Sequence, residues 1–291
     1  MTNDVQLQEG PALERHRPRL FGIAFRMLGD VQEAEDLVQE AMLRWQTAEP
    51  ASVREPEAWL VAVVTRLAID RLRQARTKRA LYTGPWLPEP IAEERLSPEY
   101  RAELASDLSM AFLVLLERLA PEERAAFLLR EVFGCEYDQI AQALGKSPAA
   151  ARQTVHRARE RVRAQRPRFA APADAKERLL GRFISALQSG DQEALLGLFA
   201  EDAEWTSDGG AKIHASRRVQ RGARRIARML AKFATKFGSD TTYRLSRLNG
   251  EPAVLEFVSG HVFAATFCET DGERVVAMYR VLNPDKLTHV S

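Results

Sequence analysis

The stretch EYDQIAQALGKSPAAARQTVHRARERVRA, residues 136–164, predicts two short helices joined by a tight turn. The first helix has apolar side chains at positions i, i+3, i+4 and i+7, namely Tyr137, Ile140, Ala141 and Leu144. Gly145 can end this helix in a left-handed conformation, while Ser147 and Pro148 suit the cap and first position of the next helix. Such a short connection is typical of a helix-turn-helix.

The second helix of this stretch carries two parallel stripes. The apolar stripe consists of Ala151, Val155, Ala158 and Val162, and a basic stripe follows one residue later at Arg152, His156, Arg159 and Arg163. We expect Arg152, Gln153 and His156 to reach base edges or phosphates in a DNA groove. Sequence-independent phosphate contacts are expected from Arg157, Arg159, Arg161 and Arg163. Arginine-rich helices are also common on surfaces without a partner, so a purely structural alternative stays open.

Length and composition limit the class of protein. The 291 residues predict two or three domains, and 45% hydrophobic with 28% charged residues are typical of globular proteins. No window has the roughly 18 uncharged apolar residues of a membrane-spanning helix, and residues 1–10 lack the apolar core of a signal peptide. We therefore expect a cytoplasmic protein without a membrane partner. Cys135 and Cys268 stand alone, which predicts neither a zinc site nor a disulfide framework.

The N-terminal part predicts two further helices. One begins at Asp30, with Glu33 completing a pattern like a capping box, and runs to about Gln46 with one apolar and one acidic face. The other begins near Pro56 and changes along its length from apolar to basic. This change is expected of a buried helix that emerges onto a phosphate-facing surface, although a solvated basic helix end explains it equally well.

The C-terminal part has a different pattern. Helices are predicted from Asp174, over DQEALLGLF and around residues 221–237, with a strand and turn at AEWTSDGG. Four strand-like runs follow near residues 243–248, 253–258, 261–268 and 274–281, separated by Asn-Gly, Ser-Gly and Asp-Gly turn signals. This order predicts an α+β domain in which a curved antiparallel sheet wraps over helices.

The two helical blocks resemble the extracytoplasmic-function sigma factors of the sigma-70 family. EAEDLVQEAMLRWQ (33–46) is similar to the part of region 2 that docks on the polymerase beta-prime subunit, and PEAWLVAVVTRLAIDRLR (56–73) to the part that opens and reads the minus-ten element. Residues 117–164 resemble region 4, which reads the minus-thirty-five element. The resemblance implies core RNA polymerase, through its beta-prime and beta subunits, and promoter DNA as partners.

Carried over by position, the resemblance assigns roles to individual residues. It implies polymerase contacts by Asp36, Gln39 and Glu40. It places Arg66, Asp70 and Arg73 in the promoter-opening segment, and Arg152, Gln153 and His156 on the reading face.

The C-terminal part resembles the SnoaL-like cone. WLPEP (86–90), DGGAK (208–212) and NPDKL (283–287) are similar to motifs of a sigma-factor subgroup with a fused SnoaL-like extension. In that subgroup the extension is thought to regulate in cis through intramolecular contacts, which here would involve Trp86, Pro88, Asp208, Gly209, Gly210, Lys212, Asn283, Pro284, Asp285 and Lys286. The middle motif usually reads DGGGK. If its third glycine supplies a positive φ angle, the loop around Ala211 is expected to be shaped differently.

Taken together, these patterns predict a multidomain protein with two all-α sigma domains and a C-terminal α+β SnoaL-like cone. The predicted limits are 1–80 for region 2, 81–105 for a linker, 106–165 for region 4, 166–173 for a second linker and 174–291 for the cone.

Two other classes of function stay open. The cone could be a ligand sensor or an enzyme if Asp208, His214, His261 or Tyr279 converge in a pocket, although no nucleophile has an attendant base at a diagnostic spacing. The helix-turn-helix could also serve a repressor that works without polymerase. We expect no catalytic residues, no metal and no cofactor, since no phosphate-binding glycine loop or ligand-spaced set of His and Cys is present.

Overall fold

The computed structural model describes residues 13–48, 53, 55–80, 82–92, 94, 96–104, 108–165, 173–237 and 240–290. These residues form two compact units. The N-terminal unit draws on Met1–Lys78, Leu96–Leu108 and Phe112–Arg166, and the C-terminal unit on Arg79–Arg95, Ser109–Ala111 and Pro167–Ser291. Both helical blocks thus lie in one unit, while residues 79–95 between them belong to the other. The predicted linker 166–173 lies outside the described residues except for Ala173.

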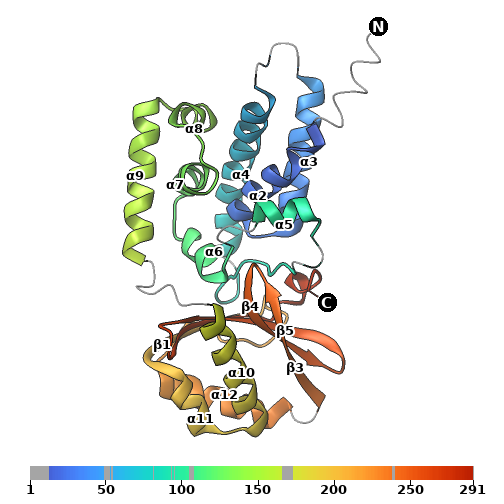
Figure 1. Ribbon diagram of the computed structural model, residues 1–291, viewed down its shortest axis with the longest axis vertical. Coiled ribbons are helices and arrows are strands. Elements are labelled where there is room, and N and C mark those ends of the chain that lie inside the picture. Colours follow the sequence, from blue (N-terminus) through green and yellow to red (C-terminus); the bar gives the residue numbers. More distant parts are fainter. Residues whose placement is uncertain are drawn as a thin grey trace. The chain divides into compact units, whose positions relative to one another are not determined.

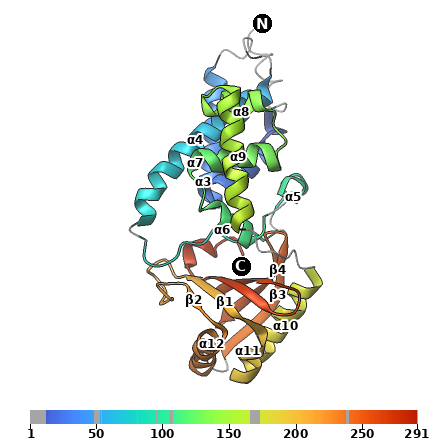
Figure 2. The same cartoon turned by 90° about the vertical axis from the view of Figure 1, so that its left-hand side faces the viewer.

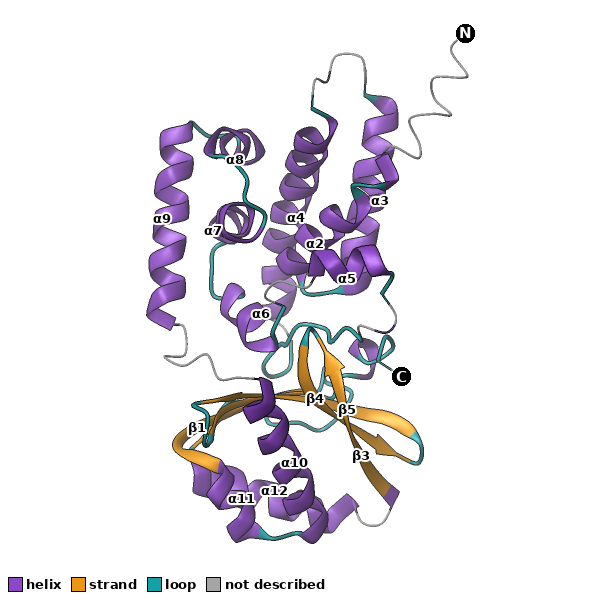
Figure 3. Cartoon of the chain, in the orientation of Figure 1, coloured by secondary structure: helices purple, strands orange, loops and turns teal. Residues whose placement is uncertain are grey.

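Where the N-terminal unit is described, it consists of helices and the loops that join them (Figure 3). Its α-helices are α2 (Arg17–Leu28), α3 (Val31–Thr47), α4 (Pro56–Ala80), α5 (Pro98–Leu104), α6 (Met110–Leu116), α7 (Pro121–Phe127), α8 (Tyr137–Leu144) and α9 (Pro148–Gln165). A π-helical turn, Leu128–Val132, follows α7. α5 lies within the segment predicted as a linker, so that segment is not a simple coil.

The helix ends follow the capping signals in the sequence. The Asp30 carboxylate accepts the Glu33 amide at 2.8 Å and caps α3, as predicted. Gly145 ends α8 at φ 63°, and the Ser147 hydroxyl accepts the Ala150 amide at 3.3 Å at the start of α9. The predicted helix-turn-helix is therefore confirmed in both its helices and its turn.

The two helical blocks share polar contacts through a buried arginine. The Arg124 side chain on α7 is 2% exposed, and its Nε donates to the Arg26 carbonyl of α2 at 2.9 Å. Its guanidinium also pairs with Glu117. Burying this guanidinium is tolerable only because these partners compensate for its lost hydration, so α2 and α7 are bound as parts of one unit.

The C-terminal unit combines three helices with a sheet. α10 (Ala173–Ser189), α11 (Gln192–Leu198) and α12 (Ala223–Phe237) cover one face of the sheet (Figures 1 and 2). The strands are β1 (Phe199–Asp208), β2 (Gln220–Arg221), β3 (Thr241–Leu248), β4 (Glu251–Val258), β5 (His261–Thr270) and β6 (Val275–Val281), and a 3-10 turn, Pro284–Lys286, follows. The predicted α+β SnoaL-like architecture is confirmed.

The sheet is mixed rather than purely antiparallel. Its strand order is β2-β1-β6-β5-β4-β3, and β1 pairs with β6 in parallel, with Trp205 opposite Met278. The expectation of an antiparallel sheet is therefore wrong at this pair. The physical reason is the long connection after β1, which includes α12 and carries the chain to the far edge of the sheet, from where three hairpins return to β1.

Irregular strand pairing curves the sheet around its helices. The register shifts between β1 and β6, between β4 and β5, and between β5 and β6. Such shifts bend a sheet and increase its twist. The concave face holds a core in which Phe183 of α10 packs against Trp205 of β1 with ring centroids 6.3 Å apart.

Candidate functional site

The predicted reading face of α9 is exposed. Arg152, Gln153, His156 and Arg157 all lie on its solvent side, opposite the buried stripe of Ala151, Val155, Ala158 and Val162. The Arg152 guanidinium lies over the Tyr137 ring at 5.2 Å, so α8 helps to orient it.

Further along α9, four arginines already have acidic partners within the protein, including Arg157 with Glu123 at 3.8 Å and Arg163 with Glu160 at 3.4 Å. Both Nε and Nη2 of Arg159 donate to Glu131, at 2.8 and 2.5 Å. Arg161 pairs with Glu123. These guanidinium groups would have to exchange an internal carboxylate for a phosphate, so α9 is free for DNA at its first turns and partly neutralised beyond them.

The predicted promoter-opening residues of α4 are engaged by the helix-turn-helix block. Arg66 donates to the carbonyls of Gln142 and Ala143 at 2.5 and 3.2 Å, at the C-terminal end of α8. Arg73 pairs with Asp70 at 3.1 Å and with Glu122 at 2.7 Å. A guanidinium at a helix C-terminus satisfies free carbonyls and the helix dipole. In this arrangement Arg66 and Arg73 hold the two blocks together.

The predicted polymerase-contacting residues share one side of α3. Asp36 and Gln39 are exposed, and the Asp36 carboxylate accepts a surface hydrogen bond from Gln32 at 2.8 Å. Glu40 is half-buried, 2.7 Å from Arg44. Exposed pairs of this kind contribute little to stability, so the carboxylates of this face are available to a partner.

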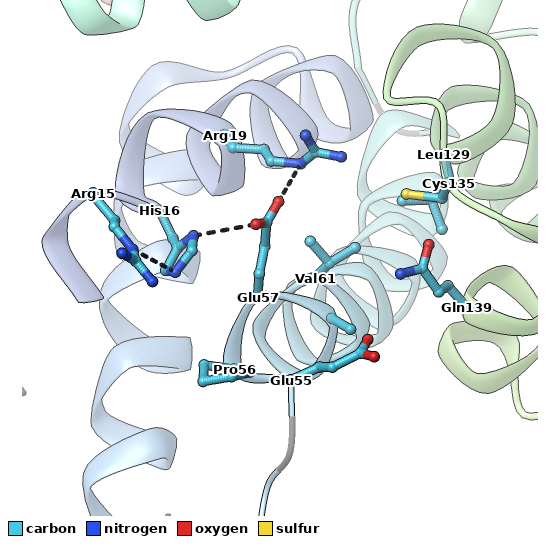
Figure 4. Close-up of a pocket in the computed structure, with 11 residues that line it drawn as sticks. Arg15, His16, Arg19, Glu55, Pro56, Glu57, Val61, Leu129, Cys135 and Gln139 are labelled. Atoms are coloured by element: carbon cyan, nitrogen blue, oxygen red, sulfur yellow. Dashed lines mark hydrogen bonds and ion pairs between the residues drawn. The ribbon is translucent and has the colours of Figure 1, made fainter. Parts of the chain in front are cut away.

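The N-terminal unit also contains a polar cleft of about 340 Å³ between α2, α4 and the segment around Cys135 (Figure 4). The Glu57 carboxylate forms an ion pair with Arg19, whose Nε lies 3.1 Å away, and lies 3.6 Å from His16. Burial, opposed by Glu57, lowers the pKa of His16. Burial likewise raises the pKa of the Cys135 thiol, which favours its protonated, unreactive form.

The three motifs of the C-terminal unit meet at the carboxylate of Asp208. This side chain at the end of β1 is fully buried. Its Oδ1 accepts the Tyr82 hydroxyl at 2.6 Å and the Gly210 amide at 3.1 Å. Its Oδ2 accepts the Leu87 amide at 2.9 Å and the Lys286 ammonium at 2.7 Å. We call Tyr82, Leu87, Asp208, Asn283 and Lys286 the motif cluster.

Lys286 connects the C-terminal tail to the WLPEP segment. Besides Asp208, its ammonium donates to the Leu87 carbonyl at 2.5 Å and lies 4.0 Å from the centroid of the Trp86 ring. Arg79 covers the same indole at 3.5 Å. A buried ammonium is tolerable only with such compensation, so Lys286 requires both Asp208 and the docked segment.

The remaining members of the cluster fix the shape of the DGGAK loop. The Asn283 amide donates to the Tyr82 hydroxyl at 3.1 Å, and burial followed by the Asp208 hydrogen bond raises the pKa of Tyr82, which keeps the phenol protonated. Gly210 has φ 60°, and a Cβ there would lie 2.4 Å from the Asn283 side chain. Only glycine permits this approach.

The Ala211 loop does not take a different shape to avoid a positive φ angle. Ala211 itself has φ 60°, in the left-handed region. A β-carbon makes this conformation about 1 kcal/mol less favourable than it is for glycine. The premise that alanine must avoid a positive φ angle at this position is therefore wrong, because the backbone accommodates the strain. Lys212, the next residue, forms an exposed ion pair with Asp285 at 2.6 Å.

The segment between the helical blocks is anchored to the C-terminal unit at two further points. The main-chain N–H of Ile91 donates to the side-chain oxygen of Asn249 at 2.7 Å. The main-chain N–H of Asn249 donates back to the Ile91 carbonyl at 2.9 Å. The Met110 amide donates to Glu251 at 2.7 Å. The two anchoring residues, Asn249 and Glu251, both belong to the β3–β4 hairpin. Glu251 also forms an ion pair with Lys176 at 2.7 Å, and Glu269 forms another with the same lysine at 2.6 Å.

The predicted catalytic candidates do not converge. Of the four, only His214 lines the cavity of the cone. Asp208 belongs to the motif cluster, and exposed His261 lies at the start of β5, 3.0 Å from the Ser259 carbonyl. Among the described residues, no three His, Cys, Asp or Glu side chains could hold a metal ion together. In the same part of the chain, no helix is long and apolar enough to cross a membrane.

Sequence reasoning missed several residues of these sites. Tyr82 and Asn249 carry no motif of their own, although Asn249 begins the Asn-Gly turn signal. Lys176, Glu251 and Glu269 come from three distant elements, and no sequence spacing could bring them together. The contribution of WLPEP is mainly the backbone of Leu87 and the face of Trp86, whereas buried Pro88 stiffens the segment.

Three family models match successive parts of the chain. They are sigma-70 region 2 over residues 12–78, sigma-70 region 4 over residues 109–162 and the SnoaL-like domain over residues 180–290.

Relatives match over nearly the full length. The extracytoplasmic-function (ECF) RNA polymerase sigma factor SigJ of Mycobacterium tuberculosis is 35% identical over 98% of this chain and 94% of its own. The probable ECF RNA polymerase sigma factor SigI of the same species is 30% identical over 95% and 93% of the two chains. The crystal structure of SigJ superposes with a TM-score of 0.76, covering 96% of this chain and 98% of the other at 32% identity.

Proposed function

Because the chain belongs to the extracytoplasmic-function sigma factors of the sigma-70 family, we propose that its SnoaL-like domain controls transcription in cis by holding the linker between regions 2 and 4. The chain is an RNA polymerase sigma factor that directs promoter-specific initiation. The proposal concerns how its third domain acts on that function.

The observation that carries the proposal is the motif cluster. Asp208 and Lys286 belong to the SnoaL-like domain, yet they bind the main chain of Leu87 on both its amide and its carbonyl. Main-chain recognition of this kind fixes the path of the linker and not only its attachment. The buried Asp208–Lys286 pair depends on the docked linker for its shielding from water, so docking and the state of the pair are coupled.

The geometry of the anchors supports an inhibitory role for the docked state. Ile91 is held at Asn249 and Met110 at Glu251. The α-carbons of these two hairpin residues are at most about 7 Å apart, the spacing of a fully extended chain. The minus-ten and minus-thirty-five elements lie about 25 base pairs apart, or roughly 85 Å at 3.4 Å per base pair. Holding Ile91 and Met110 on one hairpin keeps the chain between them folded back, which opposes that separation of the reading surfaces.

The same proposal assigns the partner-facing residues. Promoter DNA is contacted by Arg152, Gln153, His156, Arg157 and Arg159 of region 4 and by Arg66, Asp70 and Arg73 of region 2. Asp36, Gln39 and Glu40 contact the beta-prime subunit of core RNA polymerase, and the protein also binds the beta subunit. Both contacts form in the cytoplasm. Release of the linker is accompanied by loss of the Arg66 and Arg73 contacts between the two blocks, which frees these guanidinium groups for DNA.

Run-off transcription with core RNA polymerase tests the regulatory proposal. We expect full-length Asp208→Asn and Lys286→Met proteins to give at least about threefold more transcript than wild type from the same start site, because each weakens linker docking by more than about 1 kcal/mol. Arg221→Gln is the control, since Arg221 forms an exposed pair with Glu204 away from the cluster. Equal yields from wild type and both cluster variants would refute cis control while leaving the sigma function intact.

A further inference from the structure

The SnoaL-like domain encloses a cavity that the motif cluster does not use. It has a volume of about 280 Å³ and lies between the concave face of the sheet and α12. Its walls are largely apolar and include three aromatic side chains, Trp205 of β1, Phe233 of α12 and Phe263 of β5. This volume and lining suit a small ligand with a flat apolar body.

One wall of the cavity carries a buried ion pair. Arg280 of β6 donates to Glu256 of β4 at 2.5 Å, and the two side chains are only 14% and 4% exposed. Because each charge is neutralised by the other, the pair offers the cavity polarity without net charge. A ligand anion would have to compete with Glu256 for the guanidinium, and a ligand cation would have to compete with Arg280 for the carboxylate.

A phenol hydroxyl is available beside this pair. Tyr243 of β3 lines the cavity, and no hydrogen bond among the described residues involves its hydroxyl. Burial and then the neighbouring Glu256 raise the pKa of Tyr243 to about 12, so the group is neutral and can donate as well as accept. A half-buried hydroxyl of this kind is a natural partner for one polar group of a ligand.

We propose that this cavity binds a small, uncharged aromatic molecule that carries one hydroxyl or carbonyl group. The aromatic walls hold the ring system, the Tyr243 hydroxyl bonds the polar group, and the Glu256–Arg280 pair excludes ligands with a net charge. This assignment depends on the cavity alone.

The cavity is adjacent to the motif cluster through two strands. On β1, Ser207 lines the cavity while the next residue, Asp208, receives the linker. After β6, Leu282 lines the cavity while Asn283 belongs to the cluster. Successive side chains of a strand point to opposite faces, so an occupant that shifts either strand alters linker docking. This second step rests on the proposed function.

Calorimetric titration of the full chain tests the site with three matched probes: 2-naphthol, naphthalene and 2-naphthoate. We expect wild type to bind 2-naphthol about fivefold more tightly than naphthalene, the effect of one hydrogen bond. It should bind 2-naphthoate at least about tenfold more weakly than 2-naphthol, because the carboxylate would have to displace Glu256 from Arg280 while losing its own hydration. Absence of saturable 2-naphthol binding, or equal affinity for all three probes, would overturn the assignment.

Two variants locate the binding. Glu256→Gln leaves Arg280 without its counterion, so the affinity for 2-naphthoate should rise at least about tenfold and its disadvantage against 2-naphthol should disappear. Tyr243→Phe should lower 2-naphthol affinity about fivefold and leave naphthalene affinity unchanged, and this variant removes only a half-buried hydroxyl if Glu256→Gln fails to fold. Binding that neither folded variant alters would place the probe elsewhere and refute the site.

Run-off transcription with saturating 2-naphthol separates the two steps. We expect transcript yield to change at least about twofold in wild type and not in Asp208→Asn, where the linker is already released. Probe binding with unchanged transcription overturns the coupling, whereas an unchanged yield in the Asp208→Asn and Lys286→Met proteins without probe overturns the proposed function.

Discussion

Removing the Asp208 charge is the sharpest perturbation of linker docking. Asp208→Asn keeps the shape of the side chain but leaves the ammonium of Lys286, 2.7 Å away and 7% exposed, without a countercharge. Breaking a buried pair in this way costs about 3–5 kcal/mol. When the linker is released, water solvates the Lys286 ammonium, so the loss of the countercharge destabilises only the docked state. At about 1.4 kcal/mol per factor of ten, the open population should rise at least about 100-fold.

Amide hydrogen exchange measures this opening directly, because the Leu87 amide donates to Asp208 only while the linker is docked. Lys286→Met should increase Leu87 exchange less, by about 10- to 100-fold, since Asp208 keeps the donors of Tyr82, Leu87 and Gly210. In the double variant Asp208→Asn/Lys286→Met, the Leu87 amide should exchange far more slowly than the product of the two single increases predicts, because no unpaired charge is buried.

The exposed pair of Arg221 and Glu204 provides the matched control. Arg221→Gln removes a charge from the same domain at a site worth less than about 1 kcal/mol, so Leu87 exchange should change less than about threefold. The reasoning is refuted if Asp208→Asn changes Leu87 exchange no more than this control, or if the two single effects multiply in the double variant.

Three further outcomes follow from the geometry. Ala211→Gly should raise the unfolding free energy of the C-terminal unit by about 0.5–1 kcal/mol in urea titration, because glycine relieves the strain at φ 60°; a destabilised variant would contradict this. Lys176→Met leaves Glu251, whose pKa burial already raises, beside Glu269 without a cation. When the pKa of a carboxyl is higher in the folded than in the unfolded protein, protonation favours the folded state, and this advantage is lost as pH rises. Lowering the pH from 8 to 5 should therefore raise the thermal stability of Lys176→Met relative to wild type. Arg152→Ala should weaken promoter binding by about 1–3 kcal/mol and Arg159→Ala by less, because Glu131 already pairs with Arg159; equal losses in a salt-matched mobility-shift titration would contradict this.

Local signals in the sequence determine most of the elements. Asp30 and Gly145 mark helix ends that depend only on neighbouring residues, and the stripe of Ala151 to Val162 identifies the buried side of α9 without knowledge of its partner. The parallel β1–β6 pair was not predictable in this way. It depends on where the chain returns after α12, and that is decided by the packing of the whole sheet.

The sites show the same division. Exposure of Arg152 and Gln153 follows from the helical period, but the internal pairing of Arg159 with Glu131 depends on tertiary contacts. Motif resemblance identified Asp208 and Lys286, yet it gave no indication that they bind the main chain of Leu87. A backbone amide or carbonyl has no sequence signature, so contacts of this type escape any analysis of residue identities.

The distribution of charge in the motif cluster suits a reversible contact. Both charges of the buried pair, Asp208 and Lys286, belong to the SnoaL-like domain, whereas the linker contributes only neutral groups to them: a phenol, an amide, a carbonyl and the faces of Tyr82 and Trp86. Undocking the linker therefore never separates the two charges, and the pair can be hydrated intact. The polar part of the opening free energy is then about three hydrogen bonds, each to a charged group, roughly 5–9 kcal/mol. A partner that binds the released state with that differential affinity, such as core polymerase, is sufficient to open it.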